Sequence, residues 1–436
     1  MRVAGLIVEY NPFHNGHLHH LQESVRLSKA DYAVCVMSGH FLQRGEPALL
    51  DKWTRAAMAV SGGADLVFEL PYAFSGRSAE YFATGAVDLL SATGIVTHIC
   101  FGSETADLDV LKPISKILAE EPPLFQDLFK EASAKGLPFP SARQEALLEY
   151  LKTSAGEKTG GNLSLDKFRS CISEPNNILG IEYLKALIRK KSRIKPIAIP
   201  RIGPHYHEET FSKEKIASAT AIRHHLEKTH NDSQTEGNLQ QIESVMPKKS
   251  YEIMSDAIAK GRGPVFKENF ASMILSQLRR LSPTEIASIV DIREGLENRL
   301  KNSARQAVSL EDLLDKTKTK RFPRTTLQRI LFHVLADFRK EAAEIFENLK
   351  TPPYLRVLGF SKRGRRLLQT VNESAAIPII QRPAPFMKPS ANETVSSETI
   401  QMLGLDILTT DLYVLGFLNP QQRTGGQDYT HKIITH

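Results

Sequence analysis

The chain has 436 residues, of which 41% are hydrophobic and 24% charged, a globular composition that excludes a wholly disordered or fibrous protein and allows about two or three domains. Its apolar runs are far shorter than the roughly 20 residues of a membrane span, and no charged leader precedes them, so we expect a soluble cytoplasmic protein with no membrane contact. The formal net charge is +7, and residues 301–370 hold 16 basic against 7 acidic side chains, which indicates a polyanion-binding surface unless it is a solvated basic helix face.

Short apolar runs alternate with helical stretches through the first 200 residues. We predict buried parallel strands over residues 3–9, 32–37, 65–70, 98–101 and 194–199. We predict helices between them over residues 16–30, 52–60 and 178–189. Strands separated by helices of this length indicate an α/β fold with a Rossmann-like, doubly wound parallel sheet. Ligands of such sheets bind at the carboxyl ends of the strands.

The second half of the chain has a different pattern. A polar stretch at residues 230–237 predicts a boundary between a first domain, 1–235, and a basic, mainly helical domain, 236–436. We predict amphipathic helices over residues 251–260, 266–280, 284–298 and 325–348. After residue 352 we predict strands over residues 355–358, 376–380 and 412–418.

The strongest functional signal follows the first strand, where the chain reads His14-Asn15-Gly16-His17 before a helix. Gly16 permits close approach of the backbone, and the free N–H groups of a helix N-terminus bind anions. Two imidazoles at that point can donate hydrogen bonds to phosphate oxygens and stabilise the charge of a transition state. The alternative to such an anion-binding site is that both histidines lie on the helix surface and bind no ligand.

This H-x-G-H sequence resembles the signature of the nucleotidyltransferase superfamily. Residues 216–223 resemble the superfamily's I-S-S-T-x-I-R segment, with Ser218 and Thr220 as hydroxyl donors and Arg223 as the closing cation. Ala219 departs from that pattern, and the segment lacks the lysine that many relatives carry, so Arg201 and Lys215 are both open as the cation facing pyrophosphate. A simple N-capped helix start would also explain the serine and threonine.

Four segments, residues 8–17, 38–47, 101–104 and 175–180, together resemble the tRNA(Met) cytidine acetate ligase family. The resemblance covers residues 1 to about 225, and a weaker resemblance is found at residues 321–330. It implies that ATP and acetate form acetyl-adenylate and pyrophosphate. The acetyl group then passes to N4 of the wobble cytidine of elongator tRNA(Met), and AMP leaves. A magnesium ion is expected to accompany the ATP, with no metal ligand assigned in the chain.

The resemblance also implies a nucleotide site, in which His14 and His17 act in catalysis. Its ATP contacts are expected to be Ile7, Val8, Glu9, Tyr10, Asn11, Pro12, Phe13, His14, Asn15, Gly16, His17, Leu18, His19, His20, Gly102, Asn176, Asn177, Arg201, Ser218 and Thr220. Whether Asn176 or Asn177 contacts ATP is open, since both could instead cap the following helix. Residues 43–46 face either the acetate or the cytidine, unless they form an ordinary surface loop.

Two basic clusters are predicted to contact the phosphates of the tRNA. Their members are Lys318, Lys320, Arg321, Arg324 and Arg329 around Phe322, and Lys362, Arg363 and Arg365 around Gly364. Choosing one tRNA requires unstacked anticodon bases read at their edges, and the sequence assigns no residue to that task.

Two other functions use the same motifs. A small-molecule adenylyltransferase would join AMP to a mononucleotide or phosphopantetheine-like acceptor, and a non-catalytic RNA-binding protein would keep the nucleotide site without turnover. The basic C-terminal region favours the RNA-acetylating enzyme, because a mononucleotide enzyme of this fold needs little beyond its first domain. The general base for acetyl transfer, the oligomeric state and the exclusion of longer acids are not indicated by the sequence.

Overall fold

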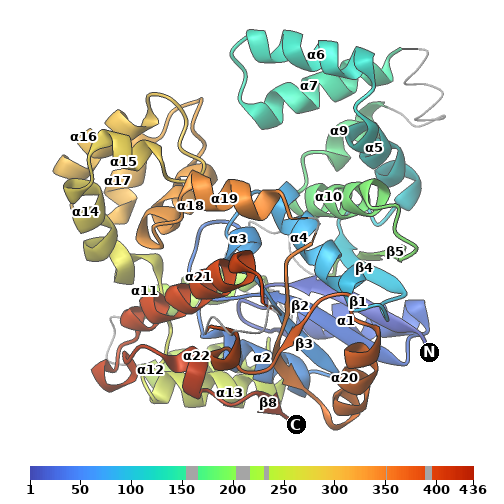
Figure 1. Cartoon of the computed structure of the whole chain (residues 1–436), viewed down its shortest axis with the longest axis vertical. Helices are drawn as coiled ribbons and strands as arrows, with labels where there is room; N and C mark the ends of the chain where they lie inside the picture. Colours follow the sequence, from blue (N-terminus) through green and yellow to red (C-terminus); the bar gives the residue numbers. More distant parts are fainter. Residues whose placement is uncertain (154–164, 203–216, 230–234, 350, 388–394) are drawn as a thin grey trace.

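Figure 1 shows the computed structural model of the chain. It describes residues 1–153, 165–202, 217–229, 235–349, 351–387 and 395–436. At its centre lies an eight-stranded sheet in the order β5-β4-β1-β2-β3-β6-β7, with β8 paired to β6. The first part of the predicted boundary stretch, residues 230–234, lies outside the described residues.

The five strands predicted in the first 200 residues are confirmed and run parallel to one another. They are β1 (Val3–Val8), β2 (Tyr32–Ser38), β3 (Leu66–Leu70), β4 (His98–Ser103) and β5 (Lys195–Pro200). From β1 the chain moves to β2 and β3 on one side, and then to β4 and β5 on the other. This reversal of direction opens a crevice beside β1, at the carboxyl ends of the strands.

Helices cover both faces of the sheet, as the nearly continuous apolar strands require. One face carries α1 (Asn15–Ser28), α2 (Lys52–Ser61), α11 (Ala219–Thr229) and α13 (Lys248–Ala259) against Leu6, Cys35 and Val67. The other face carries α4 (Ala79–Ala92), α5 (Leu108–Glu120) and α10 (Pro175–Arg189) against Val34, Phe68 and Ile99. Because successive side chains of each strand point to opposite faces of the sheet, they pack into two separate hydrophobic cores.

A helical cluster from the second half of the chain packs against the second of these faces (Figure 1). Its helices are α14 (Ala271–Arg280), α15 (Pro283–Ala287), α16 (Leu296–Gln306), α17 (Leu310–Thr317), α18 (Arg324–Leu335) and α19 (Lys340–Glu347). Two predicted helices, residues 284–298 and 325–348, are wrong as single elements. Asp291 and Asp337 have φ angles of 64° and 47°, a left-handed conformation that interrupts each helix.

The C-terminal segment returns to the sheet and crosses the boundary drawn at residue 235. Strand β6 (Leu355–Phe360) pairs antiparallel with β3, and β7 (Ile379–Ile380) and β8 (Ile434–Thr435) pair with β6. Residues 236–436 are therefore not only helical, and their strands complete the first domain's sheet. The strand predicted over residues 412–418 is wrong, because these residues end α21 (Ser397–Tyr413) and form a 3₁₀ turn.

Further helices were not assigned from the sequence. They are α3 (Tyr72–Ser75), α6 (Pro123–Ala134), α7 (Phe139–Leu151), α9 (Leu165–Cys171), α12 (Thr235–Glu243), α20 (Lys362–Ser374) and α22 (Gln427–Thr430). Among the described residues, none of the helices combines the length and the apolar composition that a membrane span needs.

Candidate functional site

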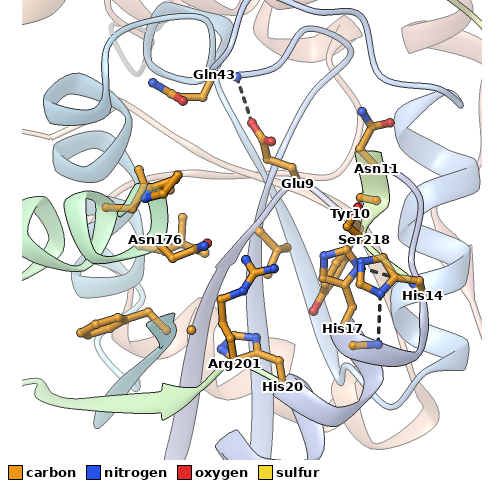
Figure 2. Close-up of a pocket in the computed structure, with 18 of the residues that line it drawn as sticks. Glu9, Tyr10, Asn11, His14, His17, His20, Gln43, Asn176, Arg201 and Ser218 are labelled. Carbon is orange, nitrogen blue, oxygen red and sulfur yellow. Dashed lines mark hydrogen bonds between the residues drawn. The ribbon is translucent and has the colours of Figure 1, made fainter. Parts of the chain in front are cut away.

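A cavity of about 240 Å³ opens at the carboxyl ends of β1, β4 and β5. Glu9 and Tyr10 leave β1 at its rim, Gly102 lies at the end of β4, and Arg201 follows β5. The cavity thus lies at the crevice that the strand order creates, where a doubly wound sheet binds its ligands. Figure 2 shows the side chains that line it.

The two histidines of the H-x-G-H sequence form the first turn of α1. His14 is the N-cap, and its Nδ1 accepts a hydrogen bond from Gly16 N over 3.0 Å. His17 Nδ1 accepts one in return from His14 N over 3.4 Å, and the ring centroids lie 3.8 Å apart. Since both Nδ1 atoms are acceptors, each neutral ring carries its proton on Nε2. Both histidines line the cavity.

The electrostatic environment keeps these rings neutral. Burial, followed by the charges of Arg201 and Arg223, lowers the pKa of His14 to about 3. Burial, the two neighbouring histidines and Arg201 hold the pKa of His17 well below its usual value. The pKa of His20 falls to about 4 through burial, His19 and Arg201. A neutral imidazole donates a hydrogen bond without requiring a buried positive charge.

Three helices begin at the cavity, which makes it favourable for an anion. Gly16 and His17 belong to the first turn of α1, Asn176 to that of α10, and Ala219 begins α11. Ser218 caps α11, because its Oγ accepts a hydrogen bond from Ala221 N over 3.0 Å. The capping interpretation of this serine is therefore confirmed, and it is compatible with a place in the cavity wall. Helix N-termini carry partial positive charge and free N–H groups.

Arginine side chains strengthen this positive field. Figure 2 shows Arg201 reaching into the middle of the cavity, between Asn176 on one side and His14 and His17 on the other. Arg223 donates to the main-chain oxygen of Asn11 over 3.0 Å and lies 3.5 Å from Glu46. The other cation left open, Lys215, lies outside the described residues.

The two asparagines at the start of α10 have different surroundings. Asn176 lines the cavity, and its Nδ2 donates to Glu104 Oε1 over 2.5 Å. Asn177 is fully buried, and its Oδ1 accepts a hydrogen bond from Ser103 Oγ over 2.6 Å. Neither residue is the N-cap, because the helix begins at Pro175 and the Glu104 carboxylate accepts the N–H groups of its first turn. Asn177 therefore fixes the loop after β4.

Glu9 contributes a carboxylate to the cavity. Its Oε1 accepts a hydrogen bond from Gln43 N over 2.9 Å, at the opposite end of the cavity from His20 (Figure 2). Burial raises the pKa of Glu9, while the Gln43 N–H group and then the charges of Arg44 and Arg223 oppose the rise. Gln43, Arg44 and Glu46 lie on the loop after β2 and line the cavity. That this loop faces the acetate or the cytidine stays a prediction.

An apolar wall was missed by the sequence analysis. It consists of Leu42, Phe82, Phe101, Leu179 and Tyr183. The rings of Phe101 and Tyr183 lie 5.8 Å apart, and α10 can approach β4 because a Cβ at Gly180 would lie 2.6 Å from the Phe101 ring. Nothing distinguishes these side chains from ordinary core residues in the sequence.

Most of the predicted nucleotide contacts meet in this cavity. Its lining includes Ile7, Val8, Glu9, Tyr10, Asn11, His14, Gly16, His17, His19, His20, Gly102, Asn176, Arg201 and Ser218. The predicted contacts outside the lining are Pro12, Phe13, Asn15, Leu18, Asn177 and Thr220.

Four of these outlying residues support the site through other contacts. Phe13 packs in the core with no exposed surface. Asn15 anchors the start of α1, since its Nδ2 donates to Ser244 O over 3.1 Å. Leu18 packs against the same core as Phe13. Thr220 Oγ1 accepts a hydrogen bond from Arg223 Nη2 over 3.4 Å and so orients that guanidinium.

The two predicted basic clusters lie far apart on the molecule (Figure 1). Helix α20 begins just after β6, whose end pairs with the start of β3, so it lies near the chain's N-terminus and away from α17 and α18 (Figure 1). Arg363 donates to the main-chain oxygen of Asp31, just before β2. The cavity lies at the other ends of these strands.

The first cluster is smaller than the sequence suggested. Lys318, Lys320 and Arg321 are exposed between α17 and α18. Arg324 instead pairs with Glu311 and with Asp315, the latter over 2.8 Å. The Arg329 side chain is only 11% exposed, with its Nε 3.7 Å from Asp291 Oδ2. Arg329 is thus largely buried beside Asp291, so it is poorly placed to contact a phosphate.

Comparisons with known proteins agree with this geometry. A family model described as HIGH nucleotidyl transferase matches residues 1–428. A protein of Acetivibrio thermocellus named tRNA(Met) cytidine acetate ligase is 43% identical over 434 residues, covering 100% of both chains. One of the same name from Alkaliphilus metalliredigens is 42% identical over 98% of this chain and 97% of its own. The crystal structure of Thermotoga maritima TmcAL bound with alpha-thio ATP has a TM-score of 0.90, with 36% identity over 100% of this chain and 99% of that chain.

Proposed function

Because this chain belongs to the tRNA(Met) cytidine acetate ligase family, we propose that it activates acetate with ATP and transfers the acetyl group to N4 of the wobble cytidine of elongator tRNA(Met). The convergence of three helix N-termini and two neutral histidine donors on one cavity carries this proposal. Such a cavity suits a polyphosphate held by backbone N–H groups. We place the reaction in the cytoplasm because a tRNA is the acceptor.

In the first step, an acetate oxygen attacks the α-phosphorus of ATP. The bond to the β-phosphate breaks, and pyrophosphate leaves with the bonding electrons. The Nε2–H groups of His14 and His17 donate to the phosphate oxygens, where negative charge increases in the transition state. Arg201 reaches the middle of the cavity and is suited to stabilise the departing pyrophosphate. The chain needs no nucleophile of its own, because positioning and electrostatics are sufficient for this chemistry.

The apolar wall gives the acetyl methyl group a place to pack. Leu42, Phe82 and Phe101 surround a space that a short acid can share with the nucleotide. Exclusion of a longer acid by such a wall is limited, since one extra methylene group changes the rate by about 10–200-fold.

A magnesium ion fits this site only as a partner of the nucleotide. Magnesium ions are often held by one or two carboxylates together with substrate phosphates and water. In the described part of the chain, no group of three His, Cys, Asp or Glu side chains is arranged to hold a metal. Phosphate oxygens and water would supply most of its ligands, and the bound ion would neutralise charge on the pyrophosphate.

The tRNA is proposed to dock on the side of the helical cluster that faces the cavity. Gly45 packs against α18, and a Cβ at Gly45 would lie 2.2 Å from Arg329 N. The same helix follows the exposed Lys318, Lys320 and Arg321. Phosphate contacts at these side chains would bring the anticodon loop toward the 42–46 loop. The cytidine must be unstacked to reach the cavity, which costs little in a single-stranded loop.

The first experiment measures pyrophosphate release from ATP with acetate and tRNA each added or withheld. We expect release that depends on acetate, and label from acetate in the tRNA. Turnover that ignores both but responds to a mononucleotide or phosphopantetheine would instead establish a small-molecule adenylyltransferase. The variant His17→Ala should lose turnover while keeping tRNA affinity. A non-catalytic RNA-binding protein would show no turnover in any of these mixtures.

A further inference from the structure

The second step of the proposed reaction needs a proton acceptor. The N4 amine of cytidine attacks the carbonyl carbon of acetyl-adenylate, an N–C bond forms, and the bond from that carbon to the phosphate oxygen breaks as AMP leaves. The amine must also lose a proton. His14 and His20 are poor acceptors, because their pKa values lie at about 3 and about 4, far from the pH at which a general base is most effective.

Two carboxylates line the cavity among the described residues, and they differ in their surroundings. The Glu46 side chain lies 3.5 Å from the Arg223 guanidinium and forms an ion pair with it. The Glu9 carboxylate accepts a backbone hydrogen bond from Gln43 N. Burial raises its pKa, which brings a carboxylate closer to the range of an effective general base.

Hydrogen bonds fix both the backbone and the side chain of Glu9. The Arg55 guanidinium donates to its main-chain oxygen over 2.6 Å, and also to Leu50 O over 3.0 Å. Gln43 fixes one carboxylate oxygen, and the second oxygen is a further acceptor on the same group. A base whose backbone and side chain are both anchored can be oriented toward a substrate atom.

The location of Glu9 matches the direction from which the RNA must come. Figure 2 places Glu9 and Gln43 at the end of the cavity opposite His20. The Gln43 loop packs on α18 through Gly45, and α18 follows the exposed basic residues. A cytidine that enters over this loop meets Glu9 before it meets the histidines. A carboxylate is also the side chain that accepts a hydrogen bond from the N4 amine of cytosine.

We propose that the Glu9 carboxylate binds the N4 amine of the target cytidine and accepts its proton as the acetyl group is transferred. This inference rests on the proposed function and adds the general base that the second step requires. It concerns acetyl transfer alone, because adenylation of acetate involves no proton of the cytidine.

The test separates the two half-reactions in the full-length enzyme. Acetate-dependent exchange of labelled pyrophosphate into ATP reports adenylation, and single-turnover transfer of labelled acetate to tRNA reports the second step. In Glu9→Gln, an amide oxygen can still accept the Gln43 hydrogen bond but cannot take up a proton. We expect the ratio of transfer to exchange to fall by about 100-fold or more. Glu9→Asp, which keeps a carboxylate, should recover part of that ratio.

The matched control is Glu252→Gln, the same change at an exposed carboxylate on α13 that pairs with Lys249 over 3.0 Å and does not line the cavity. Its ratio of transfer to exchange should stay within about threefold of wild type. Equal losses of both half-reactions in Glu9→Gln, or the same fall of the ratio in Glu252→Gln, would overturn the role of Glu9. The transfer rate of wild type should rise with pH as a carboxylate ionises, and Glu9→Gln should lack that rise. Absence of both half-reactions in wild type would instead contradict the proposed function.

Discussion

The Arg55 guanidinium donates a hydrogen bond of 2.6 Å to the main-chain oxygen of Glu9, although 46 residues separate them. Arg55 has no exposed surface, and its other hydrogen bonds end on Ser38, Gly39 and Leu50 oxygens. One buried side chain therefore holds the ends of β1 and β2 together. These are the strand ends from which the cavity's histidines and the Gln43 loop begin.

Replacing Arg55 with lysine should destabilise the protein. The ammonium group keeps the charge but loses the planar fork that reaches four carbonyl oxygens, and buried acceptors without a donor cost about 1–3 kcal/mol each. We expect the free energy of unfolding in urea to fall by about 2–4 kcal/mol. Arg26→Lys is the control, since Arg26 is 66% exposed and pairs with Glu23. An Arg55→Lys variant as stable as this control would contradict the structural role.

The buried histidines should make the protein sensitive to acid. The folded protein holds the pKa of His14 at about 3 and that of His20 at about 4, whereas an unfolded histidine titrates near 6.5. The unfolded chain therefore binds more protons below pH 6.5, so their contribution to stability is lost as the pH falls toward these folded values. Between pH 7 and pH 5 each should cost about 1–2 kcal/mol.

The variant His14→Asn isolates this effect. Asparagine is a good N-cap, so α1 should keep its start while the titration disappears. We expect the loss of unfolding free energy between pH 7 and pH 5 to be about 1–2 kcal/mol smaller than in wild type. The pKa of Asp406 is raised to about 7, so its protonation stabilises the folded protein as the pH falls. This contribution is the same in wild type and in His14→Asn and does not affect the difference between them. Equal pH dependence in the two proteins would show that His14 is not held neutral.

Salt dependence should distinguish the two basic clusters. A triple alanine variant at Lys318, Lys320 and Arg321 removes three exposed charges near the proposed docking face. Each lost phosphate contact lowers the slope of log affinity against log salt by about 0.7–0.9, so we expect a total decrease of about 2–3. Filter binding of tRNA(Met) at several salt concentrations measures it.

The comparison for that experiment is a triple alanine variant at Lys362, Arg365 and Arg366. These exposed residues lie on α20, which packs against β3 and β6 and contributes nothing to the cavity lining. We expect a smaller change of slope than in the first variant. A larger one would mean that the tRNA approaches from the α20 side, as the sequence alone allowed.

The contact between the cavity loop and α18 can be tested at Gly45. This residue has φ 73°, and an added Cβ would lie 2.2 Å from Arg329 N. Gly136 has a similar φ of 77° with nothing within 4 Å of its Cβ position. Gly136→Ala should therefore show only the conformational cost of about 1–2 kcal/mol, whereas Gly45→Ala should lose about 1–3 kcal/mol more and transfer acetyl to tRNA more slowly. Thermal unfolding and single-turnover transfer measure the two effects.

Local signals in the sequence were sufficient to predict part of the fold and of the site. The five parallel strands are short apolar runs, and the H-x-G-H motif lies directly after the first of them, so strand, turn and helix start could all be predicted. Features that depend on residues far away in the sequence could not be predicted in this way. The run of basic residues predicted that Arg329 lies on the surface. In the structure its side chain is largely buried, with Nε 3.7 Å from Asp291 Oδ2. The apolar wall of Phe82 and Phe101 has no signature, because a cavity wall and a core use the same residue types.

The antiparallel pairing of β6 with β3 has a consequence for biosynthesis. Until residue 360 has been made, β3 has an unpaired edge. Glu69 within β3 and Lys52 on α2 also lack Arg356, and until later still Asp428, with which they form a buried charge network. At about 5–20 residues per second, the roughly 125 residues between residue 235 and the end of β6 at residue 360 take at least about six seconds to make. The nascent N-terminal half must wait that long with an open strand edge, which is a hazard for aggregation. A ribosome that stalls within this interval leaves a chain that has its H-x-G-H motif but lacks β6, the strand that covers the edge of β3.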